Sequence, residues 1–274
     1  MIRAMKIVTA LLALAPLALP ASAHAAVGDW AKGQQAEARL LAAGIGADGK
    51  LDAAVEIVLP VGWHTYWRQP GEAGVPTTLD FAGSANVGAA DVAFPVPERD
   101  EDGSNIYRDH VVLPITFAVA DPGKPAALAL DVNLGVCQDI CVPDEIKATL
   151  AVPPGEKDPT AAAAIAAARA TLPGAPTPGA FAIDTVTRTG GTDGRPIFHF
   201  TGAVPDAAHA DFFVEGPGDW APYLPQLDPA STDAKAVWDV QFSRLGSTIP
   251  IPGATFRVTI RSAGKAIEQM VPLS

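Results

Sequence analysis

Basic residues and cysteines are both scarce in this chain of 274 residues, which holds 19 Lys and Arg and only two Cys. Thirty acidic residues outnumber the basic ones, so the formal net charge is −11. Because no segment gathers Lys and Arg, the phosphate contacts that a general nucleic-acid binder needs are missing, and we expect no nucleic-acid partner. Charged residues make up only 18% and hydrophobic residues 49%, which argues against intrinsic disorder.

Long hydrophobic runs are also missing, apart from one near the start. Residues 7–19 are almost wholly apolar, follow Arg3 and Lys6, and lead into the sequence Ala-Ser-Ala at 21–23. A basic start, a short apolar stretch and a small-residue exit are typical of a secretory signal peptide. A membrane anchor is the alternative, but it needs about 20 apolar residues. We therefore expect residues 1–26 to be a signal peptide, and the mature form to be exported and not embedded in a membrane.

Proline and glycine are abundant, at 26 and 25 residues, which suits short strands joined by turns. Residues 51–60 place Ala53, Val55, Ile57 and Leu59 at alternate positions, the pattern of a half-buried strand. Other strand-like runs cover 77–81, 111–120, 127–134 and 146–152, and later 181–188, 196–201, 210–215, 236–242, 255–261 and 266–271.

An alanine-rich stretch at 161–172 separates these two groups of strands and predicts a helix that begins near Asp158 or Thr160. Proline and glycine crowd the residues that follow it, up to 179. The sequence therefore predicts an all-β protein. A β-sandwich domain at 27–155 and a second one at 180–274 are joined by a short Ala-rich helix and a Pro/Gly linker at 156–179.

The two cysteines, Cys137 and Cys141, lie four positions apart, and in an exported protein such a pair is expected to form a disulfide. A ring that encloses three residues stabilises a fold less than a long loop does. A short and strained bond is better suited to reversible exchange. The alternatives are a structural hairpin clasp and a metal site. Two thiolates alone do not complete a zinc site, no His is near in sequence, and C-x-x-x-C is not the thioredoxin motif.

Acidic residues surround the cysteines, with Asp139 between them and Asp144 and Glu145 just after Pro143. Carboxylates so close would raise the pKa of a thiol and keep it protonated, which suits a protein attacked by a partner's thiolate. A solvated loop is the alternative explanation for these acids.

Aromatic residues are only 7% of the chain, yet three of them lie in the run Gly-Trp-His-Thr-Tyr-Trp-Arg at 62–68. Trp63 and Trp67 could be core anchors, whereas Tyr66 and Arg68 could border a docking surface. His64 is expected to be a hydrogen-bonded structural residue and not a metal ligand.

Several spaced motifs together resemble the N-terminal periplasmic domain of DsbD and ScsB-type proteins, which belong to the thiol:disulfide interchange family. They are the run at 62–68, Pro-Gly-Glu-Ala-Gly at 70–74, Pro-Val-Pro at 95–97, Leu-Pro-Ile at 113–115 and Cys-Gln-Asp-Ile-Cys-Val-Pro at 137–143. The resemblance covers roughly residues 55–154. It implies an immunoglobulin-like sandwich whose redox pair is Cys137 and Cys141. The three-residue spacing fits the ScsB-like branch, which is linked to copper tolerance, better than the DsbD branch.

This resemblance implies a periplasmic thiol–disulfide interchange protein that relays electrons with no bound cofactor and no metal. Its partners would be a thioredoxin-like or membrane-embedded thiol reductase and oxidised periplasmic clients. The expected catalytic residues are Cys137 and Cys141, and the expected partner-binding residues are Trp63, Tyr66, Trp67, Arg68, Asp139 and Pro143. Two other functions stay open. One is copper handling, because two thiolates bind Cu(I) well; the other is a non-catalytic binding module with a structural disulfide.

Overall fold

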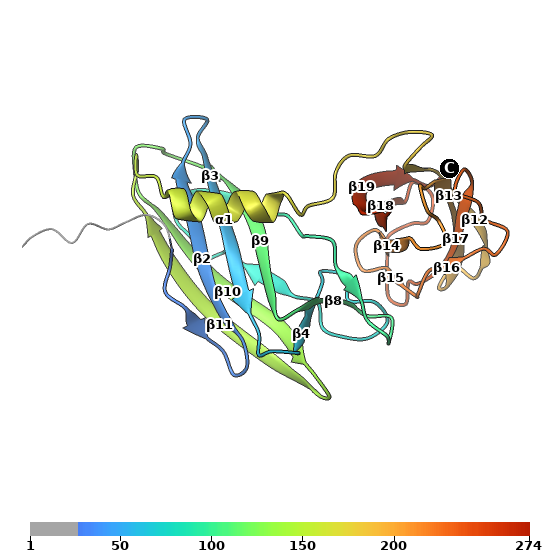
Figure 1. The fold of residues 1–274 in the computed structure, drawn as a ribbon, viewed down its shortest axis with the longest axis horizontal. Helices are drawn as coiled ribbons and strands as arrows, with labels where there is room; N and C mark the ends of the chain where they lie inside the picture. The colour runs from blue at the N-terminus through green and yellow to red at the C-terminus, as the bar shows by residue number, and fades with distance from the viewer. Residues whose placement is uncertain (1–26) are drawn as a thin grey trace, which may run out of the picture.

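The computed structural model describes residues 27–274, so the predicted signal peptide at 1–26 lies outside the described residues. Two β units lie end to end along the longest axis of the molecule (Figure 1). The first unit contains β1 to β11, and the second contains β12 to β19. Each unit consists of two sheets built of antiparallel strand pairs, and one helix, α1, is present among the described residues. The predicted all-β, immunoglobulin-like class is confirmed.

The first unit has one sheet in the order β1-β2-β3-β9-β6 and another in the order β11-β10-β4-β8-β7, with β5 paired to β10. Its strands are β1 (Ala31–Lys32), β2 (Glu37–Ile45), β3 (Lys50–Val58), β4 (His64–Tyr66), β5 (Thr78–Asp80), β6 (Val87–Val92), β7 (Glu98–Arg99), β8 (Asn105–Arg108), β9 (His110–Val119), β10 (Ala126–Cys137) and β11 (Cys141–Val152). Alternate apolar side chains of β3 and β10 fill the core between the sheets, as the period-two pattern predicts.

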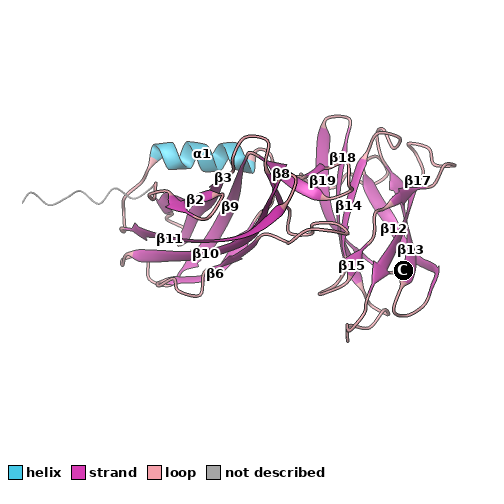
Figure 2. Cartoon of the chain, turned by 90° about the horizontal axis from the view of Figure 1, so that it is seen from below, coloured by secondary structure: helices cyan, strands magenta, loops and turns pink. Residues whose placement is uncertain are grey.

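The helix α1 (Pro159–Arg169) lies across the outer face of the sheet that contains β2, β3 and β9, and the β10–β11 sheet lies beneath that sheet (Figure 2). Asp158 caps the helix by accepting a hydrogen bond of 2.8 Å from the Ala161 N–H. Ala161 and Ile165 bury themselves against Leu41 and Ala54 of the sheet. The predicted helix is therefore present, but it belongs to the packing of the first unit instead of standing free between the units.

The second unit also consists of two sheets. One has the order β12-β13-β17-β15, with β16 paired to β17, and the other is three-stranded, in the order β14-β18-β19. Its strands are β12 (Ala182–Gly191), β13 (Pro196–Ala203), β14 (Asp211–Glu215), β15 (Ala221–Pro222), β16 (Gln226–Leu227), β17 (Ala236–Ser243), β18 (Thr255–Ser262) and β19 (Lys265–Pro272). Seven aromatic side chains pack ring against ring in its core: Phe198, Phe200, Phe212, Trp220, Trp238, Phe242 and Phe256.

The segment between α1 and β12 is attached to the second unit, because the Gly174 N–H donates to the Ala266 carbonyl at 2.9 Å. Among residues 27–274, no helix is long and apolar enough to cross a membrane.

Candidate functional site

Strands β10 and β11 form a long hairpin whose last strand-paired residues are the two cysteines. Twelve residue pairs hold this hairpin in register, and the final pair is Cys137 opposite Cys141 at a Cα–Cα distance of 4.1 Å. The two sulfurs are joined in a disulfide, and the intervening residues 138–140 form an exposed tip. Sheet pairing thus fixes both half-cystines on one end of a rigid hairpin, which presents the bond at the surface.

The two sulfur-bearing residues differ sharply in exposure. Cys137 is 1% exposed and packs with Tyr66 and Ile106, whereas Cys141 is an exposed residue. Beside it, Ile140 is 71% exposed, which is unusual for a large aliphatic side chain. Of the two half-cystines, Cys141 is therefore the one that lies closer to solvent.

The hydroxyl of Tyr66 touches both half-cystines. Its oxygen lies 3.2 Å from Cys141 Sγ and 3.3 Å from Cys137 Sγ. Neither sulfur of a disulfide carries a hydrogen, so the phenol O–H is the donor in this cluster. Burial, and after it the charges of Asp100 and Asp102, raise the pKa of Tyr66. The hydroxyl therefore keeps its proton at neutral pH.

His64 lies next to the disulfide, although it is 73 positions from Cys137 in the sequence. β4 pairs with β10 so that His64 is directly opposite Cys137, which places His64, Cys137 and Cys141 in one row across three strands. The His64 ring meets the Tyr66 ring edge to face, with 5.5 Å between centroids, and burial lowers the pKa of His64. Within residues 27–274, no group of three or more His, Cys, Asp or Glu is arranged to hold a metal ion.

The acidic residues near the cysteines separate into different environments. Asp144 is 4% exposed, and its carboxylate accepts the backbone N–H groups of residues 34, 35 and 36 at 2.7–2.9 Å. Glu145 forms an ion pair with Lys147, whereas Asp139 is exposed at the hairpin tip. Asp144 therefore fastens the start of β2 to β11, and Asp139 is the acid that lies within the ring of the disulfide. Pro143 is exposed on β11.

The aromatic residues of the run at 62–68 lie in two different environments. Tyr66 faces the disulfide, whereas Trp67 is 1% exposed and meets Phe213 of the second unit at 5.7 Å between ring centroids. Arg68 also reaches the second unit, and Trp63 is half-buried against the core of the first. Of the residues predicted to bind a partner, Tyr66, Asp139 and Pro143 are gathered around the cysteines, and Trp67 and Arg68 lie in the contact between the units.

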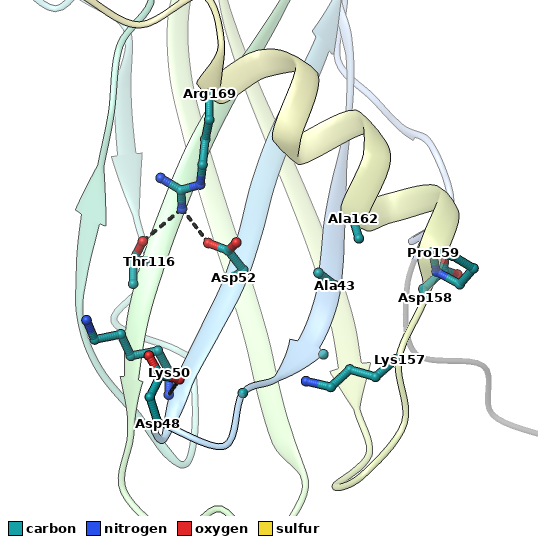
Figure 3. A pocket seen from close by; sticks show the side chains of 12 residues that line it. Ala43, Asp48, Lys50, Asp52, Thr116, Lys157, Asp158, Pro159, Ala162 and Arg169 are labelled. Atoms are coloured by element: carbon teal, nitrogen blue, oxygen red, sulfur yellow. Dashed lines mark hydrogen bonds and ion pairs between the residues drawn. The ribbon is translucent and has the colours of Figure 1, made fainter. Parts of the chain in front are cut away.

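A cavity beside α1, lined in part by charged residues, lies away from this site. It has a volume of about 500 Å³, and Figure 3 shows Lys50, Lys157 and Arg169 at its wall. Lys157 donates to the Ile45 carbonyl, and Arg169 donates to Asp52 and to Thr116. Because Lys157 and Arg169 are already hydrogen-bonded within the protein, the cavity does not present a cluster of unpaired positive charges to a ligand.

Comparison with known proteins agrees with this geometry. Residues 32–153 match the family model described as "Thiol:disulfide interchange protein DsbD, N-terminal". The structure is similar to the crystal structure of the N-terminal periplasmic domain of ScsB from Proteus mirabilis, with a TM-score of 0.67 and 20% sequence identity. That match covers 91% of this chain and 98% of the other, so both β units share its fold. No curated protein sequence gives a significant match.

Proposed function

We propose that the protein, whose residues 32–153 match the DsbD N-terminal family model, exchanges electrons with periplasmic partners through Cys137 and Cys141. The observation that carries the proposal is the asymmetric disulfide at the hairpin tip. One sulfur is buried and contacts a protonated hydroxyl, and the other belongs to an exposed residue. A clasp that only tied the hairpin together would have no need of this arrangement, because twelve strand pairs already hold it.

The exchange begins at Cys141. The thiolate of a reduced dithiol partner attacks Cys141 Sγ, a bond forms between the two sulfurs, and the bond to Cys137 breaks. The electron pair goes to Cys137 Sγ, whose thiolate is stabilised by the Tyr66 O–H. The second thiolate of the partner then attacks its own bridging sulfur and releases Cys141. The partner leaves as a disulfide and this protein as a dithiol, and the reverse sequence reduces an oxidised client.

The donor proposed here is a thioredoxin-like or membrane-embedded thiol reductase, and the acceptors are oxidised periplasmic proteins. Support comes from the surface around Cys141, where Ile140, Asp139 and Pro143 are exposed on the same hairpin end. An exposed isoleucine beside the disulfide suits docking against another protein better than binding of a small polar substrate.

The reduction potential of the disulfide tests this function. Equilibration of the mature protein in glutathione or dithiothreitol buffers is expected to give a value between roughly −120 and −270 mV, the range of exchange proteins. A potential below about −300 mV is typical of structural disulfides and would overturn the proposal in favour of a binding module.

A further inference from the structure

The second β unit holds the chain segment that follows Tyr66. The Arg68 guanidinium donates to Glu215 at 2.7 Å and to Glu268 at 2.5 Å, and its side chain is only 13% exposed. Burial opposes the charge of Arg68, but the two carboxylates raise its pKa above the ordinary value. This clasp, defined as Arg68 with Glu215 and Glu268, is therefore a charged link with little solvent screening.

A second contact lies four residues further along. The Glu72 carboxylate accepts the backbone N–H of Leu224 at 2.9 Å. Between residues 69–72 and the facing part of the second unit, the cavity measures only about 10 Å³, about the least that holds a water molecule. The loop that runs from 68 to 75, which we name the site loop, is thus fixed to the second unit at two points, Arg68 and Glu72.

The other end of the site loop rests on Tyr66. Gly74 has φ of +103°, and a Cβ there would lie 2.3 Å from an atom of the Tyr66 ring. The backbone of Gly74 therefore lies flat against the ring whose hydroxyl touches both sulfurs. A continuous series of contacts leads from Glu215 and Glu268 through Arg68 and the site loop to Tyr66, and from Tyr66 to Cys137 and Cys141.

We propose that the second β unit is a positioning element for thiol exchange, and that Arg68 and Glu72 fix the site loop so that the Tyr66 hydroxyl stays on the sulfurs. This inference rests on the proposed function. It assigns the second unit a part in the reaction even though none of its residues reaches the disulfide.

The test is the variant E215Q/E268Q in the full mature chain, which removes two charges and keeps the side-chain shapes. Without the ion pairs of Arg68, the site loop no longer holds the Tyr66 hydroxyl on the sulfurs. The hydroxyl then stabilises the Cys137 thiolate, the leaving group of the exchange, less well. We expect reduction by dithiothreitol to slow about fivefold, the effect of losing one hydrogen bond. The pH at which the reduced cysteines become reactive toward iodoacetamide is expected to rise as well, a change that a purely structural role would not produce.

Two further variants sharpen the test. E56Q removes a carboxylate that pairs with Arg39 and His110 in the first unit, on the sheet that does not carry the disulfide, and is expected to leave rate and pH profile unchanged. In a Y66F background, E215Q/E268Q is expected to add nothing, because both act through the same hydroxyl. A wild-type rate and pH profile in E215Q/E268Q, or an additive effect in Y66F, would overturn the inference.

If E215Q/E268Q fails to fold, the variant E72A replaces it, because E72A removes only the contact with Leu224. We expect E72A to shift the pH profile of cysteine reactivity in the same direction. An unchanged pH profile would overturn the inference. The proposed function fails on a different result, a disulfide in the wild type that resists exchange. The reactivity of the reduced cysteines still tests the positioning role in that event.

Discussion

Exposure distinguishes the two cysteines, and it assigns them different roles. Cys137 is buried beside Tyr66 and Ile106, whereas Cys141 is an exposed residue. In the proposed exchange, Cys137 is therefore suited to be the leaving thiolate, shielded from solvent. The pair itself could be predicted from its spacing. Which cysteine is the more exposed could not, because exposure depends on β4 and β8, which pack against the hairpin from a distant part of the sequence.

Single-cysteine variants test this assignment. C137S leaves Cys141 alone at the surface, and its thiol is expected to react with a thiol reagent at least about tenfold faster than that of C141S, in which only buried Cys137 remains. C137S is also expected to trap a mixed disulfide with an oxidised client, because the Cys141 thiolate attacks the client's disulfide and Cys137 is no longer present to resolve the product. Equal reactivity of the two variants, measured in the folded state, would contradict the order of attack given above.

Tyr66 supplies the only hydroxyl at the sulfurs among the described residues, so Y66F isolates its hydrogen bond. Loss of the donor destabilises the Cys137 thiolate, and reduction by dithiothreitol is expected to slow about fivefold. The thiol pKa, measured from the pH dependence of alkylation, is expected to rise. A faster exchange in Y66F would show that the hydroxyl hinders attack on the bond instead of assisting it.

His64 introduces a pH dependence of stability at the same place. Burial lowers its pKa below the ordinary 6.5, so below that pH the unfolded chain binds the proton more readily than the folded one. Stability from His64 is therefore present above pH 6.5 and is lost as the pH falls through the lowered pKa. We expect H64N to lose less Tm than the wild type between about pH 7 and pH 5, and an equal loss in both would contradict this.

At the scale of elements, strands that alternate could be predicted, including β3, in which Ala54 alone among the buried residues faces α1. β3 and β10 show alternation and were predicted, but β2 reads as an alanine-rich stretch without alternation. The reason is that Leu40 of β2 faces the core between the sheets, whereas Leu41 faces α1, so consecutive residues are both buried. When both faces of a strand are buried, apolar residues also occupy the positions that would otherwise be polar, and the alternation disappears.

The helix α1 provides a test of this packing. D158A removes the cap on the Ala161 N–H, which is expected to cost about 1 kcal/mol of unfolding free energy. Urea denaturation followed by far-UV circular dichroism measures it. D29A is the matched control, because Asp29 is an exposed acid that does not cap the helix, and it is expected to change stability little. Equal midpoints for D158A and the wild type would mean that the cap contributes nothing.

At the scale of the whole molecule, the two units share a core residue. Phe213 belongs to β14 of the second unit, yet it is 1% exposed and packs within the core of the first unit against Trp67. Arg99 adds to this contact, since its guanidinium lies 4.7 Å from the Phe213 ring. The sequence predicted two domains and a linker. This shared packing could not be predicted, because Trp67 and Phe213 are brought together only by the docking of two separately folded sheets.

The shared core predicts that the units unfold together. In the wild type, calorimetry is expected to show one transition, because separation of the units would expose Phe213 and Trp67 to water. F213A is expected to destabilise the protein by about 3–5 kcal/mol and to split that transition into two, since the remaining polar contacts of the interface are weaker than the lost packing.

F200A is the matched control for this experiment. Phe200 is buried wholly within the second unit, so its truncation creates a cavity of similar kind without touching the first unit. We expect F200A to lower the stability of the second unit and of the whole molecule, with the transition staying single as long as the interface is intact. Two transitions already present in the wild type would contradict the coupling of the units. So would an F213A protein that still melts in one step, because Phe213 would then not be the residue through which the second unit is tied to the site beside Tyr66.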